Sequence, residues 1–390
     1  MNILCLGSLT SIETHNAIIA FRKVGYNVIM LNISRHYFPN YIEEIPNYDN
    51  IVNLYQGVNI NKNKIIRKIE RLLIVCGLYK GRSQVVKRIN NIFKKNHIDI
   101  VYSLWGTDTL PEIKIIQNQK IHCPIIHNFL TFPGAPVSRF TRLKYLFYKE
   151  IVSNIEGRIY CSYRMYDYIN KLFNLKQKGK DIIFLDYFSE VYFPRKRLPL
   201  LSEKDGEPHI LFIGRTDFQK DSLNDVEEII KEIALNQMHV HLAETSIPIN
   251  NNDYLHFFPI FKAGNLSNGS FAEFITQFDA CIILYNFNKN NWPKDRFYNS
   301  LPNRFLFAFT GGIPIIMPEE YFLSCQEIIK KYQIGFTYKD IEDLKSKIKN
   351  KHLMKKIKEN AIKISSNFTF EKNFHKLEKF IKNIVHKKLN

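Results

Sequence analysis

The 390-residue sequence lacks the short motifs that identify several large classes of enzyme. It has no G-x-G-x-x-G after a predicted strand, which excludes the dinucleotide-binding fingerprint. The P-loop pattern G-x-x-x-x-G-K-[ST] and the G-x-S-x-G elbow of α/β hydrolases are absent as well. No two Asp residues are separated by one position, and no His residues occur at H-x-x-x-H or H-E-x-x-H spacing. We therefore expect neither a metal site nor a bound cofactor.

Long apolar runs and paired cysteines are also missing. The nearest approach to a membrane span is RLLIVCGLY, which is shorter than the ~18 residues that a span needs. The N-terminal MNILCLG enters a strand at once, without a cationic region or a cleavage site, so we expect no signal peptide. The six Cys residues form no C-x-x-C pair and are expected to be reduced thiols of a cytoplasmic protein.

Acidic residues are scarce relative to basic ones, and the formal net charge is +18. The imbalance is greatest over residues 62–95, where apolar residues are threaded among the bases and the only acid is Glu70. The bases there are Lys62, Lys64, Arg67, Lys68, Arg71, Lys80, Arg82, Lys87, Arg88, Lys94 and Lys95. This pattern predicts basic amphipathic helices that either bind an anionic membrane surface or present a solvated face. We expect no nucleic-acid binding, because no aromatic and basic platform or known motif is present.

Short apolar stretches alternate with amphipathic segments twice along the chain, as in MNILCLG before IETHNAIIAFRKVG and HILFIG before LNDVEEIIKEIAL. The pattern YRMYDYINKLF predicts a helix over residues 163–173. We therefore expect an α/β fold with two doubly wound, Rossmann-like domains, over residues 1–195 and 205–367, facing a central cleft. The Pro-rich and charged segment 194–208 is expected to be a linker, and 368–390 a basic helix that returns to the first domain.

Two cations follow the first predicted strand of the second half, in ILFIGRTDFQKDS. The strand ends at Gly214, and Arg215 and Lys220 lie in the loop that leads to the next helix. Point charges and free backbone N–H groups beside a helix N-terminus are suited to a diphosphate, although a pair of surface cations is the simpler alternative.

This stretch resembles the start of the second domain in GT-B glycosyltransferases, especially glycosyltransferase family 4 (glycosyl transferases group 1). There a strand is followed by Gly-Arg and by Lys five residues after the Arg, and these two cations hold the diphosphate of the nucleotide-sugar donor. Arg215 and Lys220 match this spacing, whereas Asp221 stands where the family commonly has Gly.

The first helix resembles the same family on its acceptor side. Glu13 and His15 match the family's Glu-x-His, but Thr10 and Ser11 stand in place of the usual pair of glycines. Further segments, including GRIYCSYRMYDYI and FITQFDACIILYN, extend the similarity over nearly the whole chain.

The stretch NSLPNRFLFAFTGGIP resembles the family's donor helix, P-N-K-x-x-E-x-x-x-x-G-x-P. Asn303 matches, Arg304 replaces the Lys, and Phe307 replaces the Glu that binds the ribose hydroxyls. Asn299, followed by Ser300, stands where a second Glu contacts the sugar. The resemblance places these residues in the donor site, while the alternative for Phe307 is a core residue of an apolar helix.

The resemblance also suggests two candidate catalytic residues in the first domain. His127, in CPIIHNFLTFPG, lies three residues earlier than a family His near the donor phosphate, and a buried core His is the alternative. Asp108, in WGTDT, is a candidate hydroxyl binder or base, which would require burial to raise its pKa. In retaining enzymes of this type, the departing phosphate itself can take the acceptor proton while Arg215 and Lys220 stabilise its charge.

The resemblance therefore implies a cytoplasmic glycosyltransferase that moves a sugar from a nucleotide sugar to a glycan or lipid-linked acceptor. It implies retention without a metal, in the synthesis of a bacterial surface polysaccharide such as lipopolysaccharide, at the inner face of the plasma membrane. Two alternatives remain open: an inverting enzyme with Asp108 as base, and a GT-B-like protein that has lost catalysis and binds a glycan or a partner. Asn299 and Phe307, where carboxylates are expected, favour the last of these.

Overall fold

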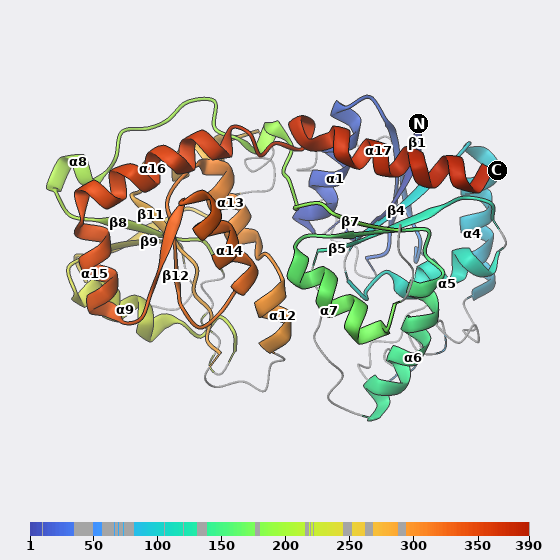
Figure 1. Ribbon diagram of the computed structural model, residues 1–390, viewed down its shortest axis with the longest axis horizontal. Helices are drawn as coiled ribbons and strands as arrows, with labels where there is room; N and C mark the ends of the chain where they lie inside the picture. The colour runs from blue at the N-terminus through green and yellow to red at the C-terminus, as the bar shows by residue number, and fades with distance from the viewer. Residues whose placement is uncertain are drawn as a thin grey trace. The chain divides into compact units, whose positions relative to one another are not determined.

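Strands and helices alternate along the chain in the computed structural model (Figure 1). The structure describes residues 1–9, 11–34, 50–56, 66, 69, 73, 82–104, 106–119, 121–130, 139–175, 180–214, 218, 220, 222–244, 252–261, 268–287 and 294–389. The chain divides into two compact units. Met1–Asp186 and Asn373–Asn390 form the first unit, and Tyr187–Lys372 form the second.

The first unit is built on a parallel sheet in the order β3-β2-β1-β4-β5-β6-β7. The strands are β1 Asn2–Gly7, β2 Asn27–Asn32, β3 Ile51–Asn53, β4 Ile100–Leu104, β5 Ile125–Phe129, β6 Gly157–Tyr160 and β7 Asp181–Ile183. The helices are α1 Ile12–Lys23, α4 Arg82–Lys95, α5 Leu110–Asn118, α6 Arg139–Ser153, α7 Tyr163–Phe173 and most of α17 Phe370–Leu389. Helices α1 and α17 lie on one face of the sheet, and α5, α6 and α7 lie on the other (Figure 1). Strands β4 and β5 are buried at every residue because both faces are covered.

Local sequence explains where the helices of this unit begin and end. The Ser11 hydroxyl accepts a hydrogen bond from the Thr14 N–H and caps α1, and Gly25 follows its end at φ +85°. Ser162 caps α7 in the same way through the N–H of Met165. The observed bounds of α7 agree with the sequence prediction.

The second unit has a six-stranded parallel sheet in the order β10-β9-β8-β11-β12-β13. The strands are β8 His209–Phe212, β9 His239–Ala243, β10 Leu255–Phe258, β11 Ala280–Ile282, β12 Ile315–Pro318 and β13 Gly335–Tyr338. The helices are the 3-10 helix η1 Glu190–Tyr192, α8 Ser202–Asp205, α9 Glu227–Leu235, α11 Ser270–Ile275, α12 Lys294–Asn299, α13 Asn303–Gly311, α14 Leu323–Tyr332, α15 Ile341–Lys349 and α16 Lys351–Ser365. The chain runs outward from β8 to β10 and then returns to β11, so the direction of winding changes between β8 and β11. Ligands of doubly wound sheets bind at the carboxyl ends of the strands at such a switch point.

The segment 194–208 does not form a separate linker but lies within the second unit. The Leu198 N–H donates to the Thr276 hydroxyl at 2.8 Å, and the Leu201 N–H donates to the Gln277 carbonyl at 2.9 Å. A short helix, α8, follows. Because these backbone groups bond to the C-terminal end of α11, the Pro and charge content of the segment was a misleading signal of a linker.

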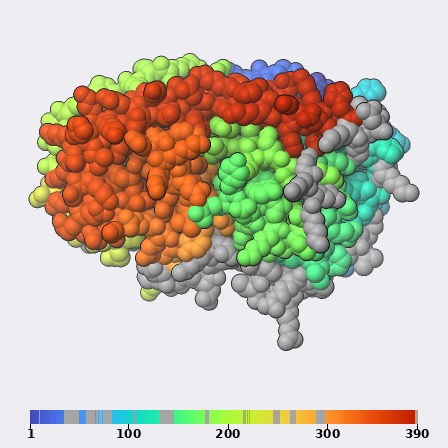
Figure 2. All heavy atoms as spheres, in the orientation of Figure 1, coloured from blue at the N-terminus to red at the C-terminus, as the bar shows by residue number. Residues whose placement is uncertain are grey.

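The C-terminal helix returns to the first unit as the sequence predicted. The Phe374 ring meets Tyr26 edge-on at a centroid distance of 5.4 Å and Phe21 at 6.3 Å. Figure 2 shows α17 in red at the surface of this unit. These contacts place α17 against α1 and the turn that follows it. The expected α/β fold of two doubly wound domains with a returning helix is confirmed.

Of the basic segment 62–95, the structure describes mainly α4. Val85, Ile89 and Ile92 of α4 are buried, whereas Lys87 and Lys94 are exposed. The apolar stripe therefore packs inward, and a membrane surface would meet only the cationic face. Among the described residues, no helix combines the length and apolar character needed to cross a bilayer. The described cysteines form no disulfide and are buried, at positions 5, 123, 161, 281 and 325.

Candidate functional site

A buried arginine occupies the switch point of the second sheet. The Arg304 guanidinium donates from Nη1 to the carbonyl of Leu284, just beyond β11, at 2.5 Å. Its Cζ lies 3.8 Å from the centroid of the Tyr285 ring and 5.3 Å from that of Phe212 in β8. Only 8% of Arg304 is exposed. The carboxyl ends of β8 and β11 therefore enclose a cation.

Gly214, two residues beyond β8, leaves the room that this arginine needs. A Cβ at Gly214 would lie 3.0 Å from Nη2 of Arg304 and 2.7 Å from Cζ of Phe212. Both atoms belong to side chains that fill the switch point, so any larger residue would displace them. The structure thus brings together two of the residues that the sequence assigned to donor binding, although they are far apart in the chain.

The charge of Arg304 has no carboxylate to balance it among the described residues. Arg304 forms no ion pair with any of the described Asp or Glu residues. Its guanidinium contacts one carbonyl and two aromatic faces. It is the second residue of α13, whose N-cap position is Pro302 and carries no side-chain cap. Buried cations are normally paired, and helix N-termini favour anions. The site is therefore suited to a negatively charged ligand.

The remaining predicted donor residues differ in their environments. Lys220 is exposed, and Arg215 lies outside the described residues. Asn303 is the first residue of α13, and Ser300 in the preceding turn is buried. The Asn299 carbonyl accepts a hydrogen bond from the Ser324 hydroxyl at 3.0 Å, which ties the end of α12 to α14.

Phe307 lies one turn after Arg304 on α13 and is 8% exposed. Its ring makes edge contacts with Phe188 at a centroid distance of 5.2 Å and with Phe271 at 5.5 Å. All three residues belong to the second unit. A carboxylate at this position would face two aromatic rings and would lose its hydration, which gives a physical reason for an apolar side chain here.

His127, predicted as a catalytic residue, is fully buried in the middle of β5. Its Nε2 pairs with the carbonyl of Gly106 at 2.8 Å, and its Nδ1 has no partner among the described residues. Burial lowers the pKa of His127 to about 4, and the Gly106 contact offsets this only in part. Asp108 lies on the same turn as Gly106 but is exposed. The structure thus joins His127 to the turn after β4 and holds its ring neutral.

Glu13 and His15 lie in the first turn of α1, and both are buried. The Ser11 hydroxyl donates to the Glu13 carboxylate at 2.5 Å, and His15 Nε2 pairs with the Leu9 carbonyl at 2.6 Å. Burial lowers the pKa of His15, and its bond to Leu9 opposes that change. Both residues are therefore held by the loop that follows β1.

Sequence reasoning missed Asp186, the residue at which the first unit ends before the chain enters the second. Burial first, and the charge of Glu13 second, raise the pKa of Asp186 well above its usual range. A carboxyl with a raised pKa beside a second carboxylate is a frequent property of functional sites. No motif signals this pairing, because the two residues come from opposite ends of the first unit's sequence.

Replacing Asp186 with Asn is expected to change how stability depends on pH. In the folded chain Asp186 keeps its proton to a higher pH than in the unfolded chain, where a carboxyl titrates near pH 4. The free energy of unfolding of the native protein should therefore fall as pH rises from about 4 through the folded pKa. Asn cannot ionise, so the Asp186→Asn variant should not show this fall. The free energy of unfolding of the variant minus that of the native protein should therefore be larger at about pH 8 than at about pH 5 in urea titrations. Asp167→Asn, on the exposed side of α7, is the control, and parallel profiles for all three proteins would contradict the prediction.

No protein-family model and no curated protein matches this sequence. Solved structures, however, match over almost its whole length. A sucrose-phosphate synthase from Thermosynechococcus elongatus has a TM-score of 0.67 at 12% identity and covers 99% of this chain and 100% of its own. A glycosyltransferase from Rickettsia africae has a TM-score of 0.63 at 14% identity, covering 98% of both chains. HepE from Anabaena, solved in complex with UDP, has a TM-score of 0.64 at 11% identity, covering 98% of this chain and 100% of its own.

This is the GT-B glycosyltransferase fold. The match includes both sheets and the helices between them, since it extends over nearly the complete chain. The GT-B fold expected from the sequence is thereby confirmed. At identities of 11–14%, the agreement concerns the backbone and not any shared set of site residues.

Proposed function

We propose that this protein is a glycosyltransferase that uses a nucleotide-sugar donor, and that the donor diphosphate binds at the carboxyl ends of β8 and β11. The observation that carries the proposal is the buried Arg304 guanidinium, which contacts the carbonyl of Leu284, lies against Gly214 and has no described carboxylate partner. A diphosphate would supply the missing negative charge. Charge-assisted bonds between a guanidinium and phosphate oxygens are among the strongest in proteins.

The chemistry of the ligand is supported from two sides. The N-terminus of α13 offers backbone N–H groups that no side chain caps, and these groups bind phosphate oxygens well. HepE, which shares the fold, has been solved with UDP and with UDP-glucose. A uridine nucleotide sugar is therefore the first donor to test. Arg215 and Lys220 would add cations from the loop after β8, as the resemblance to family 4 implies.

The finer features follow from the same resemblance. We propose transfer with retention and without a metal, in which the departing phosphate accepts the proton of the acceptor hydroxyl. Arg304, Arg215 and Lys220 would stabilise the charge that develops on the phosphate. The acceptor would be a glycan or a lipid-linked glycan of a bacterial surface polysaccharide. Analysis of the anomeric configuration of the product decides between retention and inversion.

A panel of UDP, GDP, ADP, CMP and dTDP in thermal-shift assays tests the proposal. A ligand present at a hundred times its dissociation constant stabilises the protein by about 2.7 kcal/mol. We expect at least one nucleoside diphosphate, UDP first, to raise the melting temperature, whereas the monophosphate CMP should have a smaller effect. The absence of a shift with all five nucleotides would contradict a donor site. The matching nucleotide sugars then test hydrolysis and transfer.

One observation favours a second candidate, a GT-B protein that binds a glycan or a partner without catalysis. Phe307 packs against Phe188 and Phe271, where the family pattern has the carboxylate that binds the ribose. A protein that binds UDP but neither hydrolyses nor transfers from any nucleotide sugar would support this candidate over the enzyme.

A further inference from the structure

Four histidines gather on three neighbouring strands of the second unit, two of them at the amino ends of β8 and β9. His209 and His239 are the first residues of β8 and β9 and are register partners, while His241 and His256 pair between β9 and β10. The ring centroids of His209 and His239 lie 4.4 Å apart, and those of His241 and His256 lie 4.5 Å apart. His239 and His241 are two positions apart on β9, so their side chains point to the same face of the sheet.

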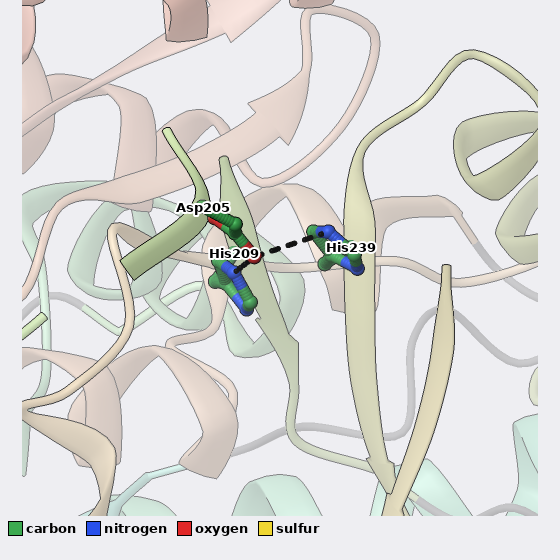
Figure 3. Close-up of side chains that lie close together, drawn as sticks. All are labelled: Asp205, His209 and His239. Atoms are coloured by element: carbon green, nitrogen blue, oxygen red, sulfur yellow. Dashed lines mark hydrogen bonds and ion pairs between the residues drawn. The ribbon is translucent and has the colours of Figure 1, made fainter. Parts of the chain in front are cut away.

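Asp205 completes a set of converging ligand atoms (Figure 3). It is the last residue of α8, and its Oδ2 lies 2.9 Å from Nε2 of His209 and 3.5 Å from Nε2 of His239. The three atoms lie within 4.8 Å of one another. Nitrogen and oxygen ligands bound at about 2.0–2.1 Å at the corners of a tetrahedron are about 3.3–3.4 Å apart. The observed spacings therefore bracket those of a tetrahedral metal site.

The other nitrogen of each converging imidazole is already engaged. Nδ1 of His209 pairs with Nε2 of His241 at 2.8 Å, and Nδ1 of His239 pairs with Nε2 of His256 at 2.7 Å. When Nδ1 of each ring carries the proton and donates, Nε2 presents its lone pair toward Asp205. This outer hydrogen bond is what orients histidine ligands in metal sites.

We propose that Asp205, His209 and His239 form a binding site for a divalent transition-metal ion, with zinc as the ion that two imidazoles and a carboxylate suit best. The side chains of His209 and His239 are 7% and 14% exposed, and that of Asp205 is 41% exposed, so one side of the site is open to a water ligand. His241 and His256 act as positioning residues behind the two ligands.

The location indicates what the metal does. His209 begins β8, whereas Gly214 lies beyond its other end, so the metal and the proposed donor lie at opposite edges of the same sheet. The metal would join α8, within the segment that was expected to be a linker, to the first residues of β8 and β9. Its role is therefore to fix this segment to the sheet, and it takes no part in the sugar transfer. No metal was expected from the sequence, because the ligands come from three separate elements and only Asp205 and His209, four residues apart, are close along the chain.

Zinc binding by the full chain, produced without a histidine tag and treated with a chelator, tests the proposal. We expect one equivalent of Zn²⁺ to bind in calorimetry and to raise the melting temperature, whereas Mg²⁺ should do neither because it prefers oxygen ligands. Co²⁺ in the same site should show the visible absorption of a tetrahedral ion. UDP affinity should be the same with and without zinc.

Variants separate this site from adventitious binding. Asp205→Asn and His239→Gln should lower zinc affinity more than a hundredfold, and His256→Gln should lower it about ten- to a hundredfold through the outer hydrogen bond. His352→Gln, an exposed histidine on α16, is the matched control and should bind as the native protein does. Because the side chain of Asp205 is 41% exposed, we expect its substitution to leave the fold intact. Binding of zinc with equal affinity by Asp205→Asn and the native protein, or no binding by the native protein, would overturn the proposal.

Discussion

Replacing Arg304 with methionine is expected to weaken the binding of UDP by about ten- to a hundredfold. Hydrogen bonds to charged groups contribute about 1.5–3 kcal/mol, and each 1.4 kcal/mol is a factor of ten in affinity. Methionine keeps much of the length and the apolar packing between Phe212 and Tyr285, so the loss reports the charge. Titration calorimetry with UDP measures the effect directly.

Arg197 provides a matched control at the opposite end of the same helix. Its Nη2 donates to the carbonyl of Gly312, the C-cap residue of α13, at 2.9 Å. Burial lowers the pKa of Arg197, so it too is a partly desolvated cation. Arg197→Met should bind UDP as the native protein does, even if it loses some stability. An equal loss of UDP affinity in both variants would point to a general effect on folding. Full UDP affinity in Arg304→Met would contradict the proposed contact between Arg304 and the diphosphate.

Replacing Arg158 with methionine is expected to lower the free energy of unfolding by about 3–5 kcal/mol, the usual cost of breaking a buried ion pair. Arg158 on β6 is fully buried, and its Nε and Nη2 donate to the two carboxylate oxygens of Asp181 on β7 at 2.7 and 3.2 Å. Methionine would leave the Asp181 carboxylate without its bidentate partner in a side chain that is only 12% exposed. Urea denaturation of the native and variant proteins measures the difference.

Two further variants test the cause of this loss. Lys114→Met breaks the ion pair with Glu150, whose side chain is 56% exposed, and should cost only about 0–1 kcal/mol. The double variant Arg158→Met with Asp181→Leu removes both charges and should recover most of the stability, since apolar replacement of a buried pair is often neutral. A double variant as unstable as the single one would show that packing and not charge is responsible.

Short-range sequence patterns were sufficient to predict helices of the fold. The stripe at Met165, Ile169 and Phe173, with Ser162 before it, predicts α7 with its observed bounds. The spacing of apolar residues along the last segment predicted a helix, and Phe374 on that helix packs against the first unit. Such features depend on residues a few positions apart, and the backbone period alone makes them visible in a sequence.

The candidate site was predictable only in part. Two local signals predicted donor-binding residues. One is a strand that ends in Gly214 before a cationic loop, and the other is a helix that begins at Asn303. That Arg304 lies against Gly214 is not local, because a guanidinium on α13 must cross the ends of β8 and β11 to reach it. Composition misled at residues 194–208, where backbone hydrogen bonds to the C-terminal end of α11 outweigh the Pro and charge content.

The sequence by itself determined the alternation of strands and helices, the two doubly wound domains and the apolar character of α13, since each follows from periodicity and short-range capping. Only the tertiary structure decided which distant side chains meet. Parallel register aligned the first residues of β8 and β9 and so brought His209 and His239 together, next to Asp205 of α8. The order of strands placed Arg304 at the switch point. Both results depend on how strands pair across the sheet, which no spacing along a single chain encodes.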